Sequence, residues 1–357
     1  MVLKENGKRL PTLSEYLEMV LPLNGSRDDE QVNQFGLETS GSKDEYYLVQ
    51  TSPDKYRMMP GPEFSPRLYR GQTKRYSTCK PQLFRGIDKN NARQKFCDFY
   101  FWSAKRYELA HIVFHHPAVK DILGWDFDGL VFDFDIQAVA QHYQYQTQML
   151  DLSRNRDVAM FFATHGFEGS ELVPRPAVGS EAVLYTIDLR AMLQSQKKSE
   201  FRLVPIGIDP LPRSAAQSAF ALEMDIGGDL EQVAGVQIET FTVTEELALS
   251  SAAKIGGEKS LFPYDSFESV ILEARGSMEV NKAAIRIMVE LGFAPEGTSV
   301  SDVADIIREG GYSVSSGELY APSEQLVTEA KKEWEIRRQS YINRLRWRGT
   351  ADAYENP

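Results

Sequence analysis

Three separated groups of residues carry the side chains that could do chemistry in this chain of 357 residues. The first is 67–72, where Arg70 and Gly71 follow an apolar pair. The second is 141–153, which contains histidine, tyrosine, threonine, aspartate and serine, and the third surrounds Gln217. An arginine near a strand end can point its planar donor fork into a cleft. The first group therefore offers a contact for an anion, and the second offers an imidazole and hydroxyls for hydrogen bonding.

The second group runs directly into a predicted helix. Residues 158–163 are apolar at helical spacing, and Ser153 or Asn155 can cap the start of this helix. The free amide groups at a helix start attract anions. We therefore expect an anion-binding helix start, flanked by Arg154, beside His142 and the hydroxyls.

The same side chains could instead have purely structural roles. His142 could be a core residue bonded to a backbone carbonyl, Asp151 could cap the following helix, and Arg70 could form a buried ion pair with Asp151. A hydrolase triad of Ser153, His142 and Asp151 is disfavoured, because these residues are too close in sequence and a Gly-x-Ser-x-Gly elbow is missing.

Composition limits the class of protein. A hydrophobic content of 42% is enough for a large core, and a net charge of −11 argues against general electrostatic capture of nucleic acid. The clearest local basic surface is the stretch at 331–348, which contains Trp334, Tyr341 and Trp347. It could contact nucleic acid, but the pattern favours a solvated helix face with arginines stacked on aromatic rings.

We expect a cytoplasmic protein without a membrane partner, because the chain has no apolar run of membrane-spanning length and its first ten residues are charged. Cys79 and Cys97 lack metal-binding spacing and are expected to be buried thiols. The histidines at 111, 115 and 116 have no acidic or cysteine ligand at a suitable spacing, so no metal site is predicted.

The periodicity predicts an α+β fold. Helices are expected at 13–21, 91–116, 127–140, 245–254 and 268–274, and strands at 46–49, 67–72, 181–189, 201–208, from 218 onward, and 236–243. After residue 276 only helical patterns are predicted. We therefore divide the chain into an N-terminal segment of helix and loop at 1–64, a core at 65–275 and a helical C-terminal region at 276–357.

The three groups together resemble the FRG domain family. The family's aromatic-Arg-Gly motif is found as residues 68–72, followed by 81–85. Its second signature resembles 141–151 with the helix 159–163, and its late Gln and Phe-Pro motifs resemble 213–220 and 261–263. Four positions depart from the family pattern, where Gln144 replaces Gly, Gln146 replaces Pro, Gln148 replaces Arg and Leu152 replaces Trp. These changes predict a different backbone and a less basic edge in this loop.

The layout also resembles ADP-ribosyltransferases, which implies a split β-sheet core with flanking helices and NAD as substrate. The resemblance places catalytic roles on Arg70, His142, Ser153 and Gln217, with Ser153 bracing the arginine. The residues expected to contact NAD are Tyr69, Gly71, Gln72, Arg85, Tyr143, Thr147, Asp151 and Arg154.

The third position departs from the transferase pattern. The family's final glutamate supplies negative charge to the transition state, whereas Gln217 is neutral. Transfer would therefore need another carboxylate, such as Glu223, Asp151 or Glu181.

Two functions follow from the resemblance. One is an NAD-dependent ADP-ribosyltransferase-like toxin or defence effector that modifies a nucleic acid or protein acceptor, with an antitoxin or chaperone as an expected partner. The alternative is a non-catalytic nucleotide-binding or sensor module that signals through its helical C-terminus.

Overall fold

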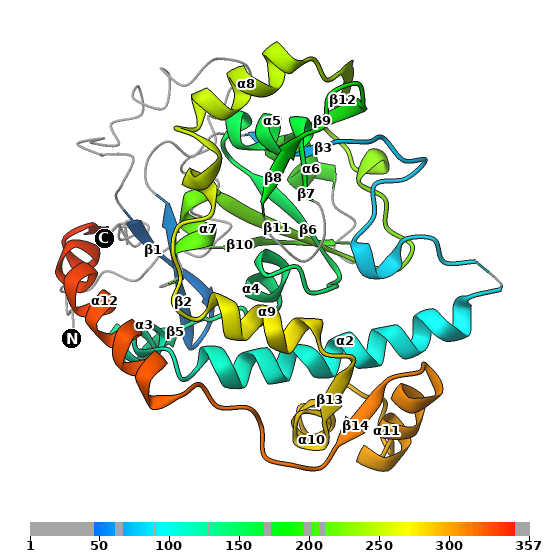
Figure 1. The fold of residues 1–357 in the computed structure, drawn as a ribbon, viewed down its shortest axis with the longest axis vertical. Helices are drawn as coiled ribbons and strands as arrows, with labels where there is room; N and C mark the ends of the chain where they lie inside the picture. Colours follow the sequence, from blue (N-terminus) through cyan, green and yellow to red (C-terminus); the bar gives the residue numbers. More distant parts are fainter. Residues whose placement is uncertain are drawn as a thin grey trace, which may run out of the picture.

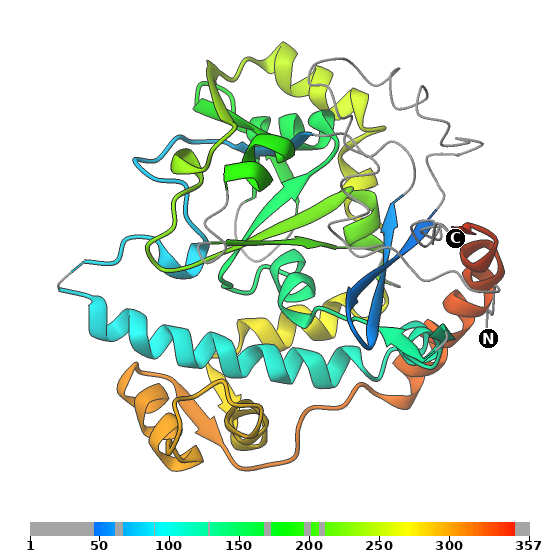
Figure 2. The same ribbon diagram turned by 180° about the vertical axis from the view of Figure 1, so that it is seen from behind.

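A computed structural model describes residues 46–60, 67–88, 90–127, 129–167, 173–195, 201–206 and 211–346. The predicted helix at 13–21 lies outside these ranges. The architecture is mixed α+β, as expected, with helices on both sides of a large central sheet (Figures 1 and 2). In the part of the chain that is described, no helix is both long and apolar enough to cross a bilayer.

The central sheet has six strands, and every neighbouring pair in it is antiparallel. Its order is β10 (Phe201–Pro205), β11 (Ala219–Met224), β6 (Met149–Ser153), β3 (Arg67–Gln72), β9 (Glu181–Asp188) and β12 (Val236–Thr242). Alternate residues of these strands, such as Leu68, Leu152, Tyr185, Phe220 and Leu222, form one buried core cluster.

The middle of this sheet is held together weakly. β3 and β9 pair over six residues, and β6 and β11 over five, but β3 and β6 are bridged only between Tyr69 and Ser153. Beyond this bridge the two strands have no ladder of their own. The sheet therefore opens between β3 and β6, and side chains of both strands face the opening.

A helix closes one side of the opening. α5 (Arg156–Thr164) follows β6 after a short turn, and Asn155 caps it by accepting a hydrogen bond from Asp157 N at 2.9 Å. It packs on β3 at Gly71, where an added Cβ would lie 1.8 Å from Ala159 O. The glycine is therefore required by contact between two backbones.

A smaller sheet lies beside the first. It contains β15 (Leu345–Arg346), β1 (Tyr46–Ser52), β2 (Lys55–Pro60), β5 (Leu130–Phe132) and β4 (Asp126–Phe127), in that order. Its core cluster includes Leu48, Tyr56, Phe132 and the C-terminal aromatic residues Trp334 and Tyr341. The beginning and the end of the described chain thus share one sheet.

The long helix α2 (Ala92–Val113) runs beneath the central sheet and contacts helices from both halves of the chain (Figure 1). It packs against α4 (Ile136–His142), α9 (Glu268–Gly276), α10 (Lys282–Glu290) and α11 (Val300–Glu309). Phe101 of α2 stacks on Tyr312 with ring centroids 3.8 Å apart.

The last helix, α12 (Glu324–Asn343), packs on α3 (Pro117–Leu123). Asp121 of α3 accepts hydrogen bonds from Trp334 Nε1 at 2.9 Å and from Arg338 Nε at 2.5 Å. Arg337 lies over the Trp334 ring at 5.9 Å. Trp334 and Tyr341 are thus core residues, and Arg338 pairs with Asp121. Trp347 of the same basic stretch lies outside the described residues.

The remaining described elements are short helices and strands. They are η2 (Gln82–Phe84), β7 (His165–Phe167), β8 (Pro174–Pro176), α6 (Leu189–Ser195), α7 (Pro212–Ala216), η3 (Leu230–Gln232), α8 (Glu245–Lys254), η4 (Glu258–Leu261), β13 (Glu279–Asn281) and β14 (Ser313–Ser315).

Most predicted elements are confirmed, and two predictions are wrong. The segment 127–140 is not one helix, because β5 pairs with β2 and a new helix begins only after Asp135, whose side chain accepts from Ala138 N at 2.9 Å. Strands also continue after residue 276, as β13, β14 and β15. These strands have two or three residues each, so they are too short to show the alternation of a strand in sequence.

Candidate functional site

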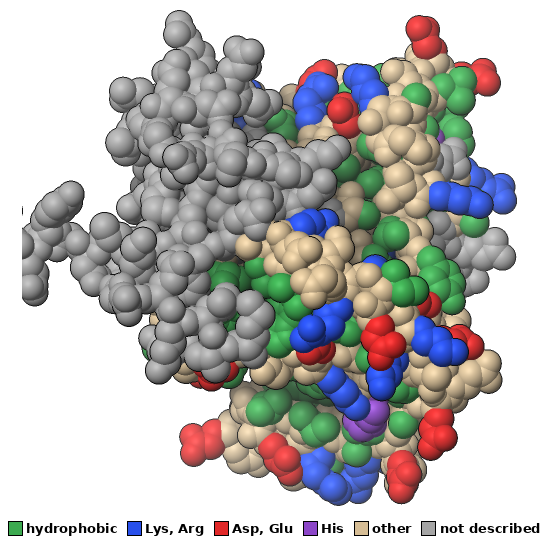
Figure 3. All heavy atoms as spheres, turned by 90° about the vertical axis from the view of Figure 1, so that its left-hand side faces the viewer, with side chains coloured by type: hydrophobic (Ala, Val, Ile, Leu, Met, Phe, Trp, Pro, Cys, Tyr) green, Lys and Arg blue, Asp and Glu red, His purple; other side chains and the backbone are tan. Residues whose placement is uncertain are grey.

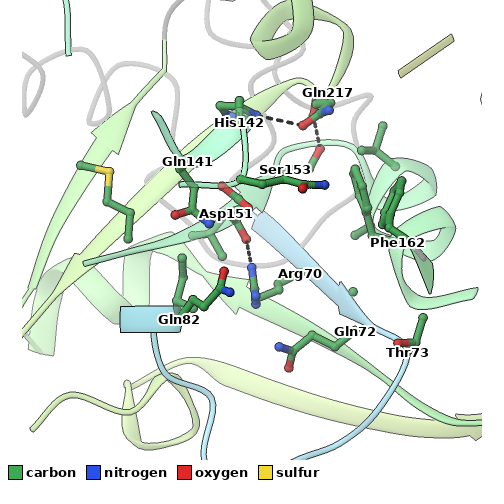
Figure 4. Close-up of a pocket in the computed structure, with 18 of the residues that line it drawn as sticks. Arg70, Gln72, Thr73, Gln82, Gln141, His142, Asp151, Ser153, Phe162 and Gln217 are labelled. Atoms are coloured by element: carbon green, nitrogen blue, oxygen red, sulfur yellow. Dashed lines mark hydrogen bonds between the residues drawn. The ribbon is translucent and has the colours of Figure 1, made fainter. Parts of the chain in front are cut away.

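A pocket of about 500 Å³ lies where β3 and β6 separate. This is within the usual size of small-molecule sites. It is lined by residues of β3 and the loop after it, the end of α4, β6, α5 and the two later segments around Gln217 and Phe262 (Figure 4). Nine predicted site residues line it, namely Tyr69, Arg70, Gly71, Gln72, Arg85, His142, Asp151, Ser153 and Gln217.

The pocket is basic although the protein is acidic. Asp151 is the one acidic residue among the described residues that line it, while Arg70, Lys74, Arg85 and Arg275 bring four cationic groups. Burial, followed by the neighbouring charge of Arg70, lowers the pKa of Arg85. Two arginines that repel each other at one wall favour an anion between them.

Arg70 spans the gap between the separated strands. Its Nη1 donates a hydrogen bond to the backbone oxygen of Asp151 at 2.7 Å, so the guanidinium replaces a ladder bond that β3 does not make to β6 (Figure 4). Its Nε is buried and has no hydrogen-bond partner among the described residues. Arg70 therefore contacts the backbone carbonyl of Asp151, and not its side chain as in the ion pair considered as a structural alternative.

His142 is held in one tautomer by Gln217. Gln217 Nε2 donates to Leu261 O at 3.2 Å, which turns Oε1 toward His142 Nδ1 at 2.9 Å. Nδ1 must then carry the proton. Burial lowers the pKa of His142, so the ring is neutral and Nε2 has a free lone pair. This Nε2 is buried without a partner in the described part of the chain, and it can accept a hydrogen bond or a proton.

Asp151 is oriented by a chain of side chains that begins in the loop before β6. Thr147 Oγ1 donates to Gln141 Oε1, and Gln141 Nε2 donates to Asp151 Oδ2 at 3.1 Å. Asp151 Oδ1 is buried and lacks a partner among the described residues. The carboxylate is therefore fixed through one oxygen, and its other oxygen is left without a hydrogen bond from the described residues. Glu223 and Glu181, the other carboxylates considered, do not line the pocket.

The expected bracing of Arg70 by Ser153 is wrong. Ser153 Oγ donates to the backbone oxygen of Gln217 at 2.8 Å and accepts from Asn155 N at 3.0 Å. It thereby fastens the segment that carries Gln217 to β6, since β6 pairs with the β11 strand that follows Gln217. The serine supports His142 through Gln217, and Arg70 is held by Asp151 instead.

Aromatic residues form the wall opposite the charged groups. Phe162 of α5, Phe167 of β7 and Phe262 make edge or tilted ring contacts, with centroids 5.4 Å apart for Phe167 and Phe262. All three line the pocket together with Val158. A planar heterocycle could pack against this wall while its polar groups reach His142 and Asp151.

Three predicted contact residues lie behind the pocket wall, and one lining residue has a packing role. Tyr143 donates its hydroxyl to Asp265, Thr147 belongs to the chain that orients Asp151, and Arg154 donates its backbone amide to Ser218 O at 3.1 Å. Gly71 lines the pocket, but its missing side chain serves contact with α5. We assign these residues supporting positions.

Two residues that hold side chains of the site were not predicted as site residues: Arg213 holds His142, and Gln141 holds Asp151. Arg213 is 1% exposed, pairs with Glu268, donates to His142 O at 3.3 Å and lies 4.9 Å from the Tyr143 ring. Gln141 was noted only as part of a motif. Arg213 lies near the third group of candidate residues and Gln141 lies in the second, and this was the only sign of their role in the sequence. The sequence did not indicate which side chains they would contact.

The backbone of the loop after His142 also differs from expectation. Gln144 has a φ of +63°, the left-handed conformation that glycine adopts most easily, and its carbonyl accepts from Arg275 Nε at 3.0 Å. The backbone at Gln144 is therefore left-handed although this residue stands where the family pattern has glycine.

Comparison with known families agrees with the motif resemblance. The family model described as the FRG domain matches residues 65–171. Neither the curated proteins nor the solved structures contain a match. The matched residues include β3, β6 and α5, whereas Gln217, Phe262 and Arg275 reach the pocket from beyond them.

Proposed function

We propose that this pocket binds NAD and breaks its bond between nicotinamide and ribose, so that the protein is an ADP-ribosyltransferase-like toxin or defence effector. The observation that carries the proposal is that three residues lining the pocket each have a buried polar atom without a partner among the described residues, namely Arg70 Nε, His142 Nε2 and Asp151 Oδ1. Buried polar atoms are normally satisfied, so these three favour a ligand with both donors and acceptors.

The charges suggest how NAD would lie. Arg70 and Arg85 match a diphosphate, because guanidinium forks bind phosphate oxygens at two points. The aromatic wall of Phe162 and Phe262 would then receive the nicotinamide. A ribose between these two ends would place its hydroxyls near His142 Nε2, which accepts hydrogen bonds.

Asp151 supplies the negative charge that Gln217 lacks. When the bond from ribose C1′ to nicotinamide N1 breaks, its electron pair leaves with the nitrogen, and positive charge develops on the ribose. A fixed carboxylate oxygen in a buried site stabilises that charge. The acceptor's oxygen or nitrogen then bonds to C1′, and its proton passes to His142 Nε2 or to water. Gln217 acts in this scheme as the residue that positions His142.

The decisive experiment measures nicotinamide release from labelled NAD by the purified protein, with and without cell extract. Asp151→Asn keeps the size of the side chain and removes its charge, so we expect release to fall about 10²- to 10³-fold with little change in NAD affinity. Asp305→Asn, on the exposed side of α11, is the matched control. Failure of the protein to bind NAD would reject the proposal.

A second candidate is a non-catalytic nucleotide-binding or sensor module. It is favoured by the Gln217 side chain, whose two polar atoms are both engaged within the protein, at the position where the transferase pattern has a glutamate. NAD binding without nicotinamide release or label transfer would select this candidate. Growth of bacteria that express the protein, compared with Arg70→Ala, then tests toxicity separately.

A further inference from the structure

A basic and aromatic rim borders the pocket on the side of the loop that follows β3. The stretch from 67 to 87 contains Arg67, Arg70, Lys74, Arg75, Lys80 and Arg85 and lacks any acidic residue, in a chain whose net charge is −11. By contrast, basic and acidic side chains are interspersed on the face drawn in Figure 3. The rim is therefore a local concentration of positive charge.

Tyr76 is the aromatic centre of this rim. It lines the pocket and is 49% exposed, and Lys74 Nζ and Arg85 Cζ lie 5.7 and 5.9 Å from its ring centroid. Arg85 is held in place because its Nε donates to Lys80 O at 2.9 Å. Arg75, the next cation, is paired with Glu231 at 3.2 Å and contributes less free charge.

We propose that this rim binds single-stranded nucleic acid, with a base stacked on Tyr76 and the neighbouring phosphates on Lys74 and Arg85. An exposed ring beside cations is the usual combination for binding single strands, because every base has a face that can stack and every nucleotide carries a phosphate. A duplex keeps its bases stacked on one another and would meet the rim only through its phosphates.

This inference deepens the proposed function and rests on it in one respect only. Because the rim opens into the same pocket, a base or sugar next to the stacked one would reach the ribose carbon that the proposed reaction attacks. The bound strand would then be the acceptor. Strand binding itself does not depend on NAD cleavage.

The experiment measures fluorescence anisotropy of labelled 20-nucleotide single strands of DNA and RNA, without NAD and at low salt. We expect binding, and we expect Tyr76→Ala to weaken it about 5- to 150-fold, which corresponds to the loss of one base stack. Tyr76→Phe retains the ring and should bind like the wild type. Tyr320→Ala removes a tyrosine of similar exposure, 51%, far from the rim, and serves as the matched control.

A charge test separates phosphate contact from stacking. Lys74→Glu should weaken binding and reduce the steepness of the plot of log affinity against log salt by about 0.7 for each lost contact. Lys331→Glu changes the charge by the same amount at an exposed position of α12, and it should alter neither the affinity for single strands nor the slope against log salt as Lys74→Glu does. A duplex of the same sequence should bind more weakly than the single strand.

Three results would overturn one or both parts of the inference. No binding of single strands up to about 100 µM protein, or equal effects of Tyr76→Ala and Tyr320→Ala, would overturn strand binding by the rim. Label transfer from NAD only to proteins in an extract would overturn the role of the strand as acceptor. Nicotinamide release by the wild-type protein without oligonucleotide is measured in parallel. Strand binding without nicotinamide release would reject the proposed reaction and support nucleic-acid binding by the rim. Nicotinamide release without strand binding would support the reaction and reject nucleic-acid binding by the rim.

Discussion

His142 Nδ1 and Gln217 Oε1 lie 2.9 Å apart, and the orientation of the glutamine amide is set by its second contact to Leu261 O. These two residues are 75 positions apart in the chain, and their contact decides which nitrogen of the imidazole carries the proton. The glutamine therefore controls the chemistry of the histidine without charge of its own.

Gln217→Glu should raise the pKa of His142 by about one unit or more, because a carboxylate beside Nδ1 favours the imidazolium. Gln217→Leu should leave the ring neutral but remove its preference for the Nδ1–H tautomer. Nitrogen chemical shifts of the histidine ring, followed by NMR as a function of pH, report both effects. A pKa and a tautomer that are the same in all three proteins would contradict this assignment.

Gly71→Ala should lower the free energy of unfolding by about 3 kcal/mol or prevent folding, because the new methyl group would overlap Ala159 O and force β3 away from α5. Gly166→Ala is the control, since it lines the same pocket and its Cβ would meet nothing within 4 Å. Urea unfolding of both variants gives the comparison. Equal stability of the two would show that α5 can move away from β3 at little cost.

Gln144→Gly should stabilise the protein by about 0.5–1 kcal/mol, because glycine relieves the left-handed backbone at φ +63°. Two residues further on, Gln146 has no positive φ, so Gln146→Gly should destabilise by a similar amount through chain entropy. Opposite signs in urea unfolding are the expected result. Destabilisation by both changes would mean that side-chain contacts of Gln144 outweigh its backbone strain.

His116 should make stability depend on pH between about 6.5 and 4. Burial lowers its pKa to about 4, so the folded protein binds this proton less readily than the unfolded chain. The contribution is complete above the unfolded value and is lost as pH falls, up to roughly 3 kcal/mol. Burial also lowers the pKa of His142, which acts in the same direction.

His116→Asn tests this dependence, because an amide oxygen can still accept from Ala118 N at the start of α3. The variant loses ring packing on Phe267 and should be less stable at pH 7, but its stability should fall less steeply toward pH 4. Unfolding curves at several pH values measure the slope. Parallel slopes for the two proteins would exclude His116 as the source.

The sequence predicted the pocket's parts better than their contacts. The strand with Arg70, the long helix α2 and the four strands between residues 181 and 242 have five or more residues each, and they were found correctly. The turn at 127–135 was missed because its strands have two or three residues and depend on pairing with β2. Short strands that exist only through distant partners leave little pattern in sequence.

The candidate site shows the same limit. Arg70, His142 and Gln217 could be chosen by type and order, and the structure brings them to one pocket. Their hydrogen-bond partners could not be predicted, because several acceptors were possible for Ser153 and for Arg70. The separation of β3 from β6 in the folded sheet determines which acceptor each side chain contacts.

The weak bridge between β3 and β6 has a consequence for dissecting the protein. A fragment limited to residues 65–171 would keep both strands but lose β9 and β11, the neighbours that hold each of them over five or six residues. It would expose two strand edges joined by one residue pair, and unpaired edges of this kind recruit other chains. Such a fragment should aggregate, and the shortest soluble unit with an intact pocket should extend at least to Arg275.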